Sequence, residues 1–188
     1  MARDDEVMPG RVATRLIHAG AFLTHSIDEV RFPDGSTGTL ELITHPGASA
    51  VVPLLSEPAA DDPHVLLIRQ YRYATGGWLY EIPAGKLDAG DTPLACAHRE
   101  LKEETGCTAA QMQHLTTFWT TPGFTNEQIH IYLATGLTRG EATPMADEFL
   151  EVVTMPMSRA LAMVQQGEIS DAKTVIGLLY AAGFALGG

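Results

Sequence analysis

Residues 85–107 read GKLDAGDTPLACAHRELKEETGC, and this stretch decides how the rest of the chain is interpreted. Thr92 is a good N-cap residue, and Pro93 suits the first position of a helix. Gly106 is typical of the residue that ends one. Between them lies an apolar stripe with spacings of three and four, formed by Leu94, Ala97 and Leu101. The pattern predicts an amphipathic helix over residues 92–104.

Three acids gather near the end of this predicted helix. Glu100, Glu103 and Glu104 are three or four residues apart or adjacent, so they project from overlapping parts of one face. They repel one another, and the helix dipole disfavours negative charge at this end. Local conflicts of this kind are expected at functional sites, and a hard divalent cation with oxygen ligands would compensate them. The alternative is a solvated charged face in which Arg99 pairs with Glu103.

The surroundings favour the functional interpretation, because the segment resembles the Nudix box. That motif is a glycine, five residues, Glu, seven residues, Arg-Glu, an aliphatic residue, one residue, Glu-Glu, one residue, Gly and an aliphatic residue. The positions in register are Gly85, Arg99, Glu100, Leu101, Glu103, Glu104 and Gly106, with Cys107 in the last apolar place. Asp91 departs from the motif, since it stands where the box has its first Glu and is one methylene shorter.

The resemblance implies roles for these residues. Glu100 and Glu104 match the principal ligands of Mg²⁺, with Mn²⁺ as a possible substitute, and Glu103 matches a further ligand or a candidate catalytic base. Arg99 matches a residue that orients the glutamates, and the carbonyl of Ala84 matches a backbone ligand. Positions with a structural role in the box are Gly85, Asp91 and Gly106. The cation would neutralise a diphosphate and lower the pKa of an attacking water.

Flanking segments resemble the ADP-ribose pyrophosphatase branch of the family. They read RQYR at 69–72, LYEIPAGK at 79–86, TPGFTNE at 121–127 and GEISDAKT at 167–174. Pro122 stands sixteen residues after the last glycine of the box, as in that branch. The resemblance covers roughly residues 40 to 182.

Residues of these segments are candidates for substrate binding and catalysis. Arg72 ends an expected buried strand, where its guanidinium could hold a phosphate or an adenine edge, or could pair internally with Glu81. The resemblance assigns Arg72, Glu81 and Gly123 to substrate binding. Glu127 is a candidate general base that reaches the site when its loop closes, or an exposed loop acid.

Short strands, such as the one expected over residues 115–120, and few helices, the last expected over residues 171–186, predict an α+β fold because they do not alternate strictly. The resemblance specifies a Nudix α/β/α sandwich with a mixed central sheet and an N-terminal antiparallel β extension. Residues 1–16 are mostly polar and open to disorder, residues 17–47 form a β region with a turn at 32–35, and residues 48–188 form the hydrolase domain. In the resembling branch the N-terminal strands build a homodimer, which we expect for residues 17–47.

Charge and cysteine content exclude several classes of protein. The 188 residues carry a net charge of -11, which argues against nucleic acid or an anionic membrane as a partner. Cys96 and Cys107 form no CxxC pair, so neither a zinc site nor a redox pair is indicated. No signal sequence or membrane span is recognisable, and the expected location is the cytoplasm.

The sequence thus predicts a Mg²⁺-dependent hydrolase with a small nucleoside diphosphate derivative as its partner. The expected reaction is hydrolysis of ADP-ribose to AMP and ribose 5-phosphate. One alternative is another substrate, such as a nucleoside diphosphate sugar or a flavin or adenine dinucleotide. The other is a Nudix-fold domain that binds a nucleotide without turning it over.

Overall fold

The computed structural model describes residues 8–143 and 149–186. The chain divides into two compact units. The first comprises Met1–Gly47 and Trp119–Gln128, and the second comprises Ala48–Phe118 and Ile129–Gly188. The second unit begins at Ala48, and residues 119–128 belong to the first unit although they lie far from it in the sequence.

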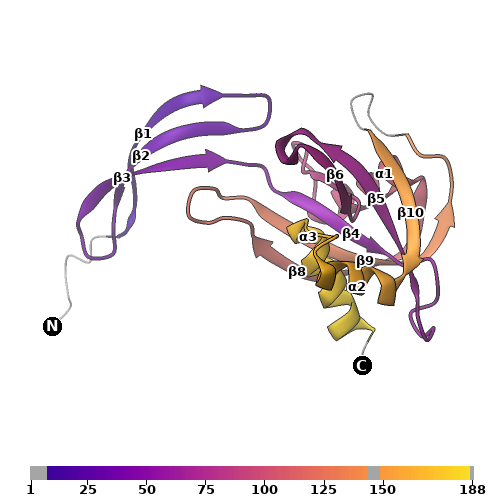
Figure 1. Ribbon diagram of the computed structural model, residues 1–188. Helices are drawn as coiled ribbons and strands as arrows, with labels where there is room; N and C mark the ends of the chain where they lie inside the picture. Colours follow the sequence, from indigo (N-terminus) through magenta and orange to yellow (C-terminus); the bar gives the residue numbers. More distant parts are fainter. Residues whose placement is uncertain (1–7, 144–148, 187–188) are drawn as a thin grey trace. The chain divides into compact units, whose positions relative to one another are not determined.

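The first unit holds an antiparallel sheet in the order β1-β2-β3 (Figure 1). Its strands are β1 (Gly10–Ala19), β2 (Thr24–Arg31) and β3 (Thr37–Thr44). The turn predicted at 32–35 joins β2 to β3, with Gly35 at φ 84°. Residues 10–16 were expected in a polar, disorder-prone segment, but they form most of β1. Backbone pairing with β2 orders them, and Thr14 donates a hydrogen bond to the buried Asp28 at 2.9 Å.

The second unit contains two sheets. An antiparallel sheet has the order β10-β5-β6, and a mixed sheet has the order β7-β4-β9-β8. The mixed sheet arises because β4 runs parallel to β9 but antiparallel to β7. The strands are β4 (Ala48–Pro53), β5 (His64–Arg72), β6 (Gly77–Glu81), β7 (Ala84–Lys86), β8 (Cys107–Trp119), β9 (Gln128–Arg139) and β10 (Leu150–Pro156).

Helices cover both faces of β4, which gives the α/β/α layers that the sequence predicted (Figure 1). Val51 belongs to a core cluster with Ala97 and Leu101 of α1, whereas the neighbouring Val52 packs in a second cluster with residues of α2 and α3. Successive strand residues point to opposite faces, so a continuous apolar run is needed to bury both sides. The helices are α1 (Pro93–Thr105), α2 (Met157–Gln166) and α3 (Ala172–Tyr180).

Helix α1 has the ends that its sequence predicted. The Thr92 hydroxyl accepts a hydrogen bond from the backbone N–H of Ala95 at 3.2 Å, and Pro93 is the first helical residue. Gly106 ends the helix at φ 72°, and its N–H donates to the carbonyl of Lys102. A Cβ at Gly106 would also lie 2.5 Å from the carbonyl oxygen of Gly140, so only glycine fits.

Some elements differ from the expectation. Strand β8 spans Cys107–Trp119 rather than residues 115–120, because backbone pairing with β9 extends it through Ala and Gln residues of low strand propensity. The short strand β7 was not expected. Helix α3 ends at Tyr180 and continues as a π-helical turn, Ala181–Ala185, instead of running regularly to Leu186.

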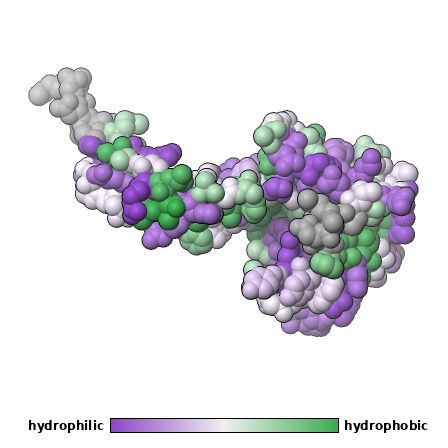
Figure 2. All heavy atoms as spheres, turned by 90° about the horizontal axis from the view of Figure 1, so that it is seen from above, coloured by the Kyte–Doolittle hydropathy of each residue, from purple (hydrophilic) through white to green (hydrophobic). Residues whose placement is uncertain are grey.

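Apolar side chains are exposed on the first unit, and Figure 2 shows a green patch among hydrophilic atoms on the N-terminal sheet. The exposed large apolar residues of this unit's N-terminal segment are Met8, Val12, Leu16, Ile17, Phe22 and Leu40.

In the part of the chain that the structure describes, no helix combines the length and apolar character needed to cross a membrane.

Candidate active site

The acids of α1 meet the backbone that follows β6. Glu104 is 1% exposed, and its Oε2 accepts a hydrogen bond from the N–H of Ala84 at 2.9 Å. Glu100 is 7% exposed and lies against Gly85. Two nearly buried carboxylates on one helix require compensation from polar or cationic partners. The backbone of residues 84–85 supplies part of it.

Gly85 has no room for a side chain. A Cβ at this position would lie 2.1 Å from Oε1 of Glu100, far inside contact distance. The glycine therefore lets a carboxylate approach the main chain between β6 and α1. This close approach explains why the motif begins with a glycine.

Arg99 joins the acids to the loop before the helix. Its Nη1 donates to Glu100 at 2.5 Å and to Glu103 at 3.3 Å, while its Nη2 donates to Asp91 at 3.1 Å. Burial lowers the pKa of Arg99, but the charge of Glu100 and the hydrogen bond to Asp91 outweigh it, and the net shift is upward. The ion pair between Arg99 and Glu103, which a solvated helix face would also show, is thus present. It belongs to a larger network that includes the buried carboxylate of Glu100.

Asp91 braces the loop despite its short side chain. Its Oδ2 accepts from Arg99 and, at 3.3 Å, from the N–H of Asp88, while its own N–H donates to the carbonyl of Asp88 at 3.0 Å. Arg99 also donates to the carbonyl of Lys86 at 3.1 Å. One guanidinium therefore spans the loop from 86 to 91 and fixes it to α1.

The donor set suits a hard divalent cation. Glu100 and Glu104 offer carboxylate oxygens beside a main chain kept open by Gly85, and oxygen ligands are those that Mg²⁺ prefers. Within residues 8–143 and 149–186, however, no three His, Cys, Asp or Glu side chains are grouped as metal ligands. Magnesium binding by Glu100, Glu103, Glu104 and the Ala84 carbonyl therefore stays a prediction.

A second ionic cluster lies where β5, β6 and α3 meet. Glu81 is 1% exposed and accepts two hydrogen bonds from Arg72, at 2.7 and 2.9 Å, and another from Lys173. Burial raises the pKa of Glu81, but the two cations outweigh it and hold the pKa below its ordinary value. The internal pair between Arg72 and Glu81 is thus present, and the Arg72 side chain still has 40% of its surface exposed.

The start of α3 holds the segment between β6 and β7. The buried Thr174 hydroxyl accepts from the N–H of Ile82 at 2.9 Å and donates to Asp171, which caps the helix. Lys173 binds Glu81 from the same helical turn. These residues were not among the predicted site residues, although the sequence 167–174 resembled the corresponding family segment.

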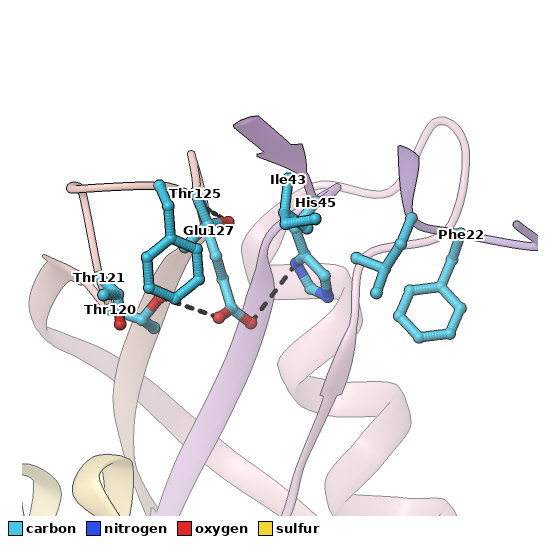
Figure 3. Close-up of a pocket in the computed structure, with 9 residues that line it drawn as sticks. Phe22, Ile43, His45, Thr120, Thr121, Thr125 and Glu127 are labelled. Carbon is cyan, nitrogen blue, oxygen red and sulfur yellow. Dashed lines mark hydrogen bonds and ion pairs between the residues drawn. The ribbon is translucent and has the colours of Figure 1, made fainter. Parts of the chain in front are cut away.

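Gly123 and Glu127 belong to the first unit, whereas the other predicted site residues belong to the second. Gly123 is exposed in the turn Thr121–Thr125, and Glu127 lines a cavity of about 400 Å³ (Figure 3). Its Oε2 accepts from the Thr120 hydroxyl at 2.9 Å, and its Oε1 lies 3.4 Å from Nδ1 of His45. Nothing in the sequence pattern paired His45 with Glu127.

Comparison with known proteins agrees with this geometry. The NUDIX domain model matches residues 45–176. The chain is 38% identical over 171 residues to the methanol dehydrogenase activator of Bacillus methanolicus, and 36% identical over 171 residues to an ADP-ribose pyrophosphatase of Bacillus subtilis (strain 168). Both alignments cover 90% of each chain. A solved ADP compounds hydrolase shares the fold, with a TM-score of 0.79 over 98% of this chain and 97% of that chain, at 22% identity.

Proposed function

The chain belongs to the Nudix family, and on this premise we propose that it hydrolyses ADP-ribose to AMP and ribose 5-phosphate with Mg²⁺. It is a pyrophosphohydrolase of the type related to ADP-ribose pyrophosphatases. The observation that carries the proposal is the pair of buried carboxylates, Glu100 and Glu104, packed against the main chain of Ala84 and Gly85.

The proposed chemistry divides between two kinds of group. Mg²⁺ held by Glu100, Glu103, Glu104 and the Ala84 carbonyl would neutralise the diphosphate and make an attacking water more acidic. Arg99 keeps two of these carboxylates in place through its hydrogen bonds. Arg72, fixed at one edge by Glu81, presents the rest of its guanidinium to a phosphate.

Glu127 is the proposed general base. Among the described residues, a threonine hydroxyl and a histidine nitrogen lie at the oxygens of this carboxylate, and an ionised carboxylate has further acceptor capacity for the proton of a water (Figure 3). Gly123, on the same turn, is proposed to allow close approach of substrate, because a Cβ there would meet nothing within 4 Å.

A substrate panel tests the reaction. The purified protein with Mg²⁺ is incubated with ADP-ribose, a nucleoside diphosphate sugar, FAD and a diadenosine polyphosphate, and products are separated by ion-exchange chromatography. We expect AMP and ribose 5-phosphate from ADP-ribose at the highest kcat/KM. Preference for a sugar nucleotide or dinucleotide would support the alternative substrates. Tight binding of ADP-ribose with no product from any compound would indicate a non-catalytic domain.

A variant at Glu104 tests the site. Glu104→Gln removes a charge but keeps the acceptor for Ala84, so the fold should survive while kcat falls by at least about 100-fold. Glu151→Gln is the matched control, because Glu151 is exposed and, within the described residues, forms its ion pair with the side chain of Arg69. Unchanged turnover in Glu104→Gln would mean that the metal assignment is wrong.

We also propose that the protein is a homodimer built through its N-terminal sheet. Strand β1 is exposed along all ten of its residues and carries the apolar side chains of Val12, Leu16 and Ile17. An exposed apolar strand at a sheet edge is unfavourable in water and favours a second chain as its cover.

A further inference from the structure

His45 lies at a branch point between two partners. Its Nδ1 is 3.0 Å from the backbone nitrogen of Gly47 and 3.4 Å from Oε1 of Glu127. The Gly47 N–H is a donor, and the ionised Glu127 carboxylate is an acceptor. A single ring nitrogen satisfies only one of them at a time: it accepts from Gly47 when it is unprotonated, and it donates to Glu127 when it carries a proton.

The rest of this region holds the pair in place. The loop that bears Glu127 is hydrogen-bonded to the end of β3, since the Ile43 N–H donates to the Phe124 carbonyl at 2.8 Å and the His45 N–H donates to Asn126 Oδ1 at 2.7 Å. The ring of Phe22 meets the His45 ring edge-on, with centroids 5.8 Å apart. The imidazole is therefore oriented by its backbone and by an aromatic neighbour, and Figure 3 shows it facing the Glu127 carboxylate.

The cavity strengthens the electrostatic interaction between His45 and Glu127 when both side chains are charged. Its walls are largely apolar, formed by Phe22, Leu23, Ile43 and Phe124, and the His45 side chain is 12% exposed. Among the residues that line this cavity, His45 and Glu127 are the titratable ones, and the other polar groups are threonine hydroxyls. Apolar surroundings strengthen the attraction between an imidazolium and a carboxylate.

We propose that His45 is a positioning residue for Glu127, holding the carboxylate when the imidazole is protonated and releasing it when the imidazole is neutral. This inference rests on the proposed role of Glu127 as general base. A carboxylate paired with an imidazolium is a weaker base, so protonation of His45 restrains the reaction. Loss of that proton returns Nδ1 to Gly47 and leaves Glu127 free to accept a proton from water.

The pairing is tested without turnover by NMR, from the nitrogen chemical shifts of the histidine rings at about pH 5, where a free imidazole is mostly protonated. In Glu127→Gln the Nδ1 resonance of His45 should move relative to wild type, because a neutral amide replaces the carboxylate that lies 3.4 Å from this nitrogen. His25, which pairs with Glu41 in the same unit, is the internal control, and its ring resonances should be the same in both proteins. An unchanged Nδ1 resonance of His45 overturns the proposal, whether or not the protein hydrolyses ADP-ribose.

The consequence for catalysis is tested by the pH profile of kcat/KM. Asn at position 45 can accept from the N–H two residues on, as an Asx turn does, but it carries no charge at any pH. In His45→Asn we expect the acidic limb of the profile to move to lower pH, whereas His25→Asn should keep the wild-type profile. A His45→Asn limb that coincides with wild type overturns the proposal. Full activity of Glu127→Gln, together with a changed Nδ1 resonance of His45, would instead contradict the proposed base and leave the pairing intact.

Discussion

Single atoms decide what position 85 tolerates. In Gly85→Ala the added methyl group would lie 2.1 Å from Glu100 Oε1, so the carboxylate must rotate away from the main chain. Only the side chain of Glu100 has to move, so the fold should be retained. The carboxylate, however, should no longer lie where it can bind the cation. We expect Mg²⁺ affinity, measured by isothermal titration calorimetry, to fall by about tenfold or more.

Gly77→Ala is the matched control for this change. A Cβ at Gly77 meets nothing within 4 Å, and Gly77 is not among the residues with positive φ. Equal Mg²⁺ affinity in Gly85→Ala and Gly77→Ala would contradict the placement of the cation beside Glu100.

Thr174 offers a residue-scale test of the segment that leads to the site. Thr174→Val keeps the shape but removes the acceptor of the buried Ile82 N–H, which should cost about 1–3 kcal/mol of unfolding free energy. Thr174→Ser keeps the hydroxyl and should recover most of that loss. Urea denaturation of the three proteins measures it, and a valine variant as stable as the serine variant would show that the hydrogen bond is unimportant.

Contacts between side chains could be predicted from the sequence where the two partners are close along the chain. Arg99 and Glu103 are four residues apart on one helix, so their contact follows from helical geometry. Lys173 and Glu81 are 92 residues apart, and no periodicity relates them. The contact exists because α3 packs against β6, which only the assembled fold determines.

At the scale of elements, the Arg72–Glu81–Lys173 cluster ties the ends of β5, β6 and α3 together. Glu81 has its pKa held below 4.5, the ordinary value, so the unfolded chain takes up a proton at higher pH than the folded chain does. The stabilisation by ionised Glu81 is complete above about pH 4.5 and is lost as the pH falls through the folded pKa. Thermal unfolding between pH 7 and pH 3 should show a decline in Tm that begins near pH 4.5.

The variant Glu81→Gln isolates this contribution. It leaves two cations without their buried anion and should cost about 3–5 kcal/mol at pH 7. In Glu81→Gln, part of the acid-induced decline in Tm should be absent, because the titrating carboxylate is gone. An identical slope of Tm against pH in the variant and the wild type would assign the acid sensitivity to other carboxylates.

Element boundaries were predictable where a local signal marks them. Thr92, Pro93 and Gly106 fix the ends of α1 through capping chemistry that acts within four residues. Strand β8 carries no such signal at its start, since residues 108–113 are mostly Ala, Gln and Met, and its length depends on its neighbour in the sheet. Tertiary pairing therefore set the boundary that sequence placed eight residues too late, at 115 instead of 107.

At the scale of the whole molecule, the division into two units follows hydrogen bonds rather than sequence order. Residues 119–128 interrupt the second unit yet join the first, because the turn at Thr121–Thr125 is bonded to Ile43 at the end of β3. The proposed base and its histidine thus belong to the same unit as the N-terminal sheet. A change in that sheet is expected to reach the base through β3.

The last prediction concerns assembly. If β1 forms the dimer contact, replacing its exposed apolar residues with charge should separate the subunits, because a buried lysine at such a contact is costly. Size-exclusion chromatography with light scattering should give a mass near 40 kDa for wild type, about twice the 20.2 kDa of the chain, and near 20 kDa for Leu16→Lys. Leu179→Lys is the control, since Leu179 is comparably exposed on α3 of the other unit and should leave the mass unchanged. A wild-type protein that is monomeric at micromolar concentration, or a Leu16→Lys variant that stays dimeric, would remove β1 from the interface.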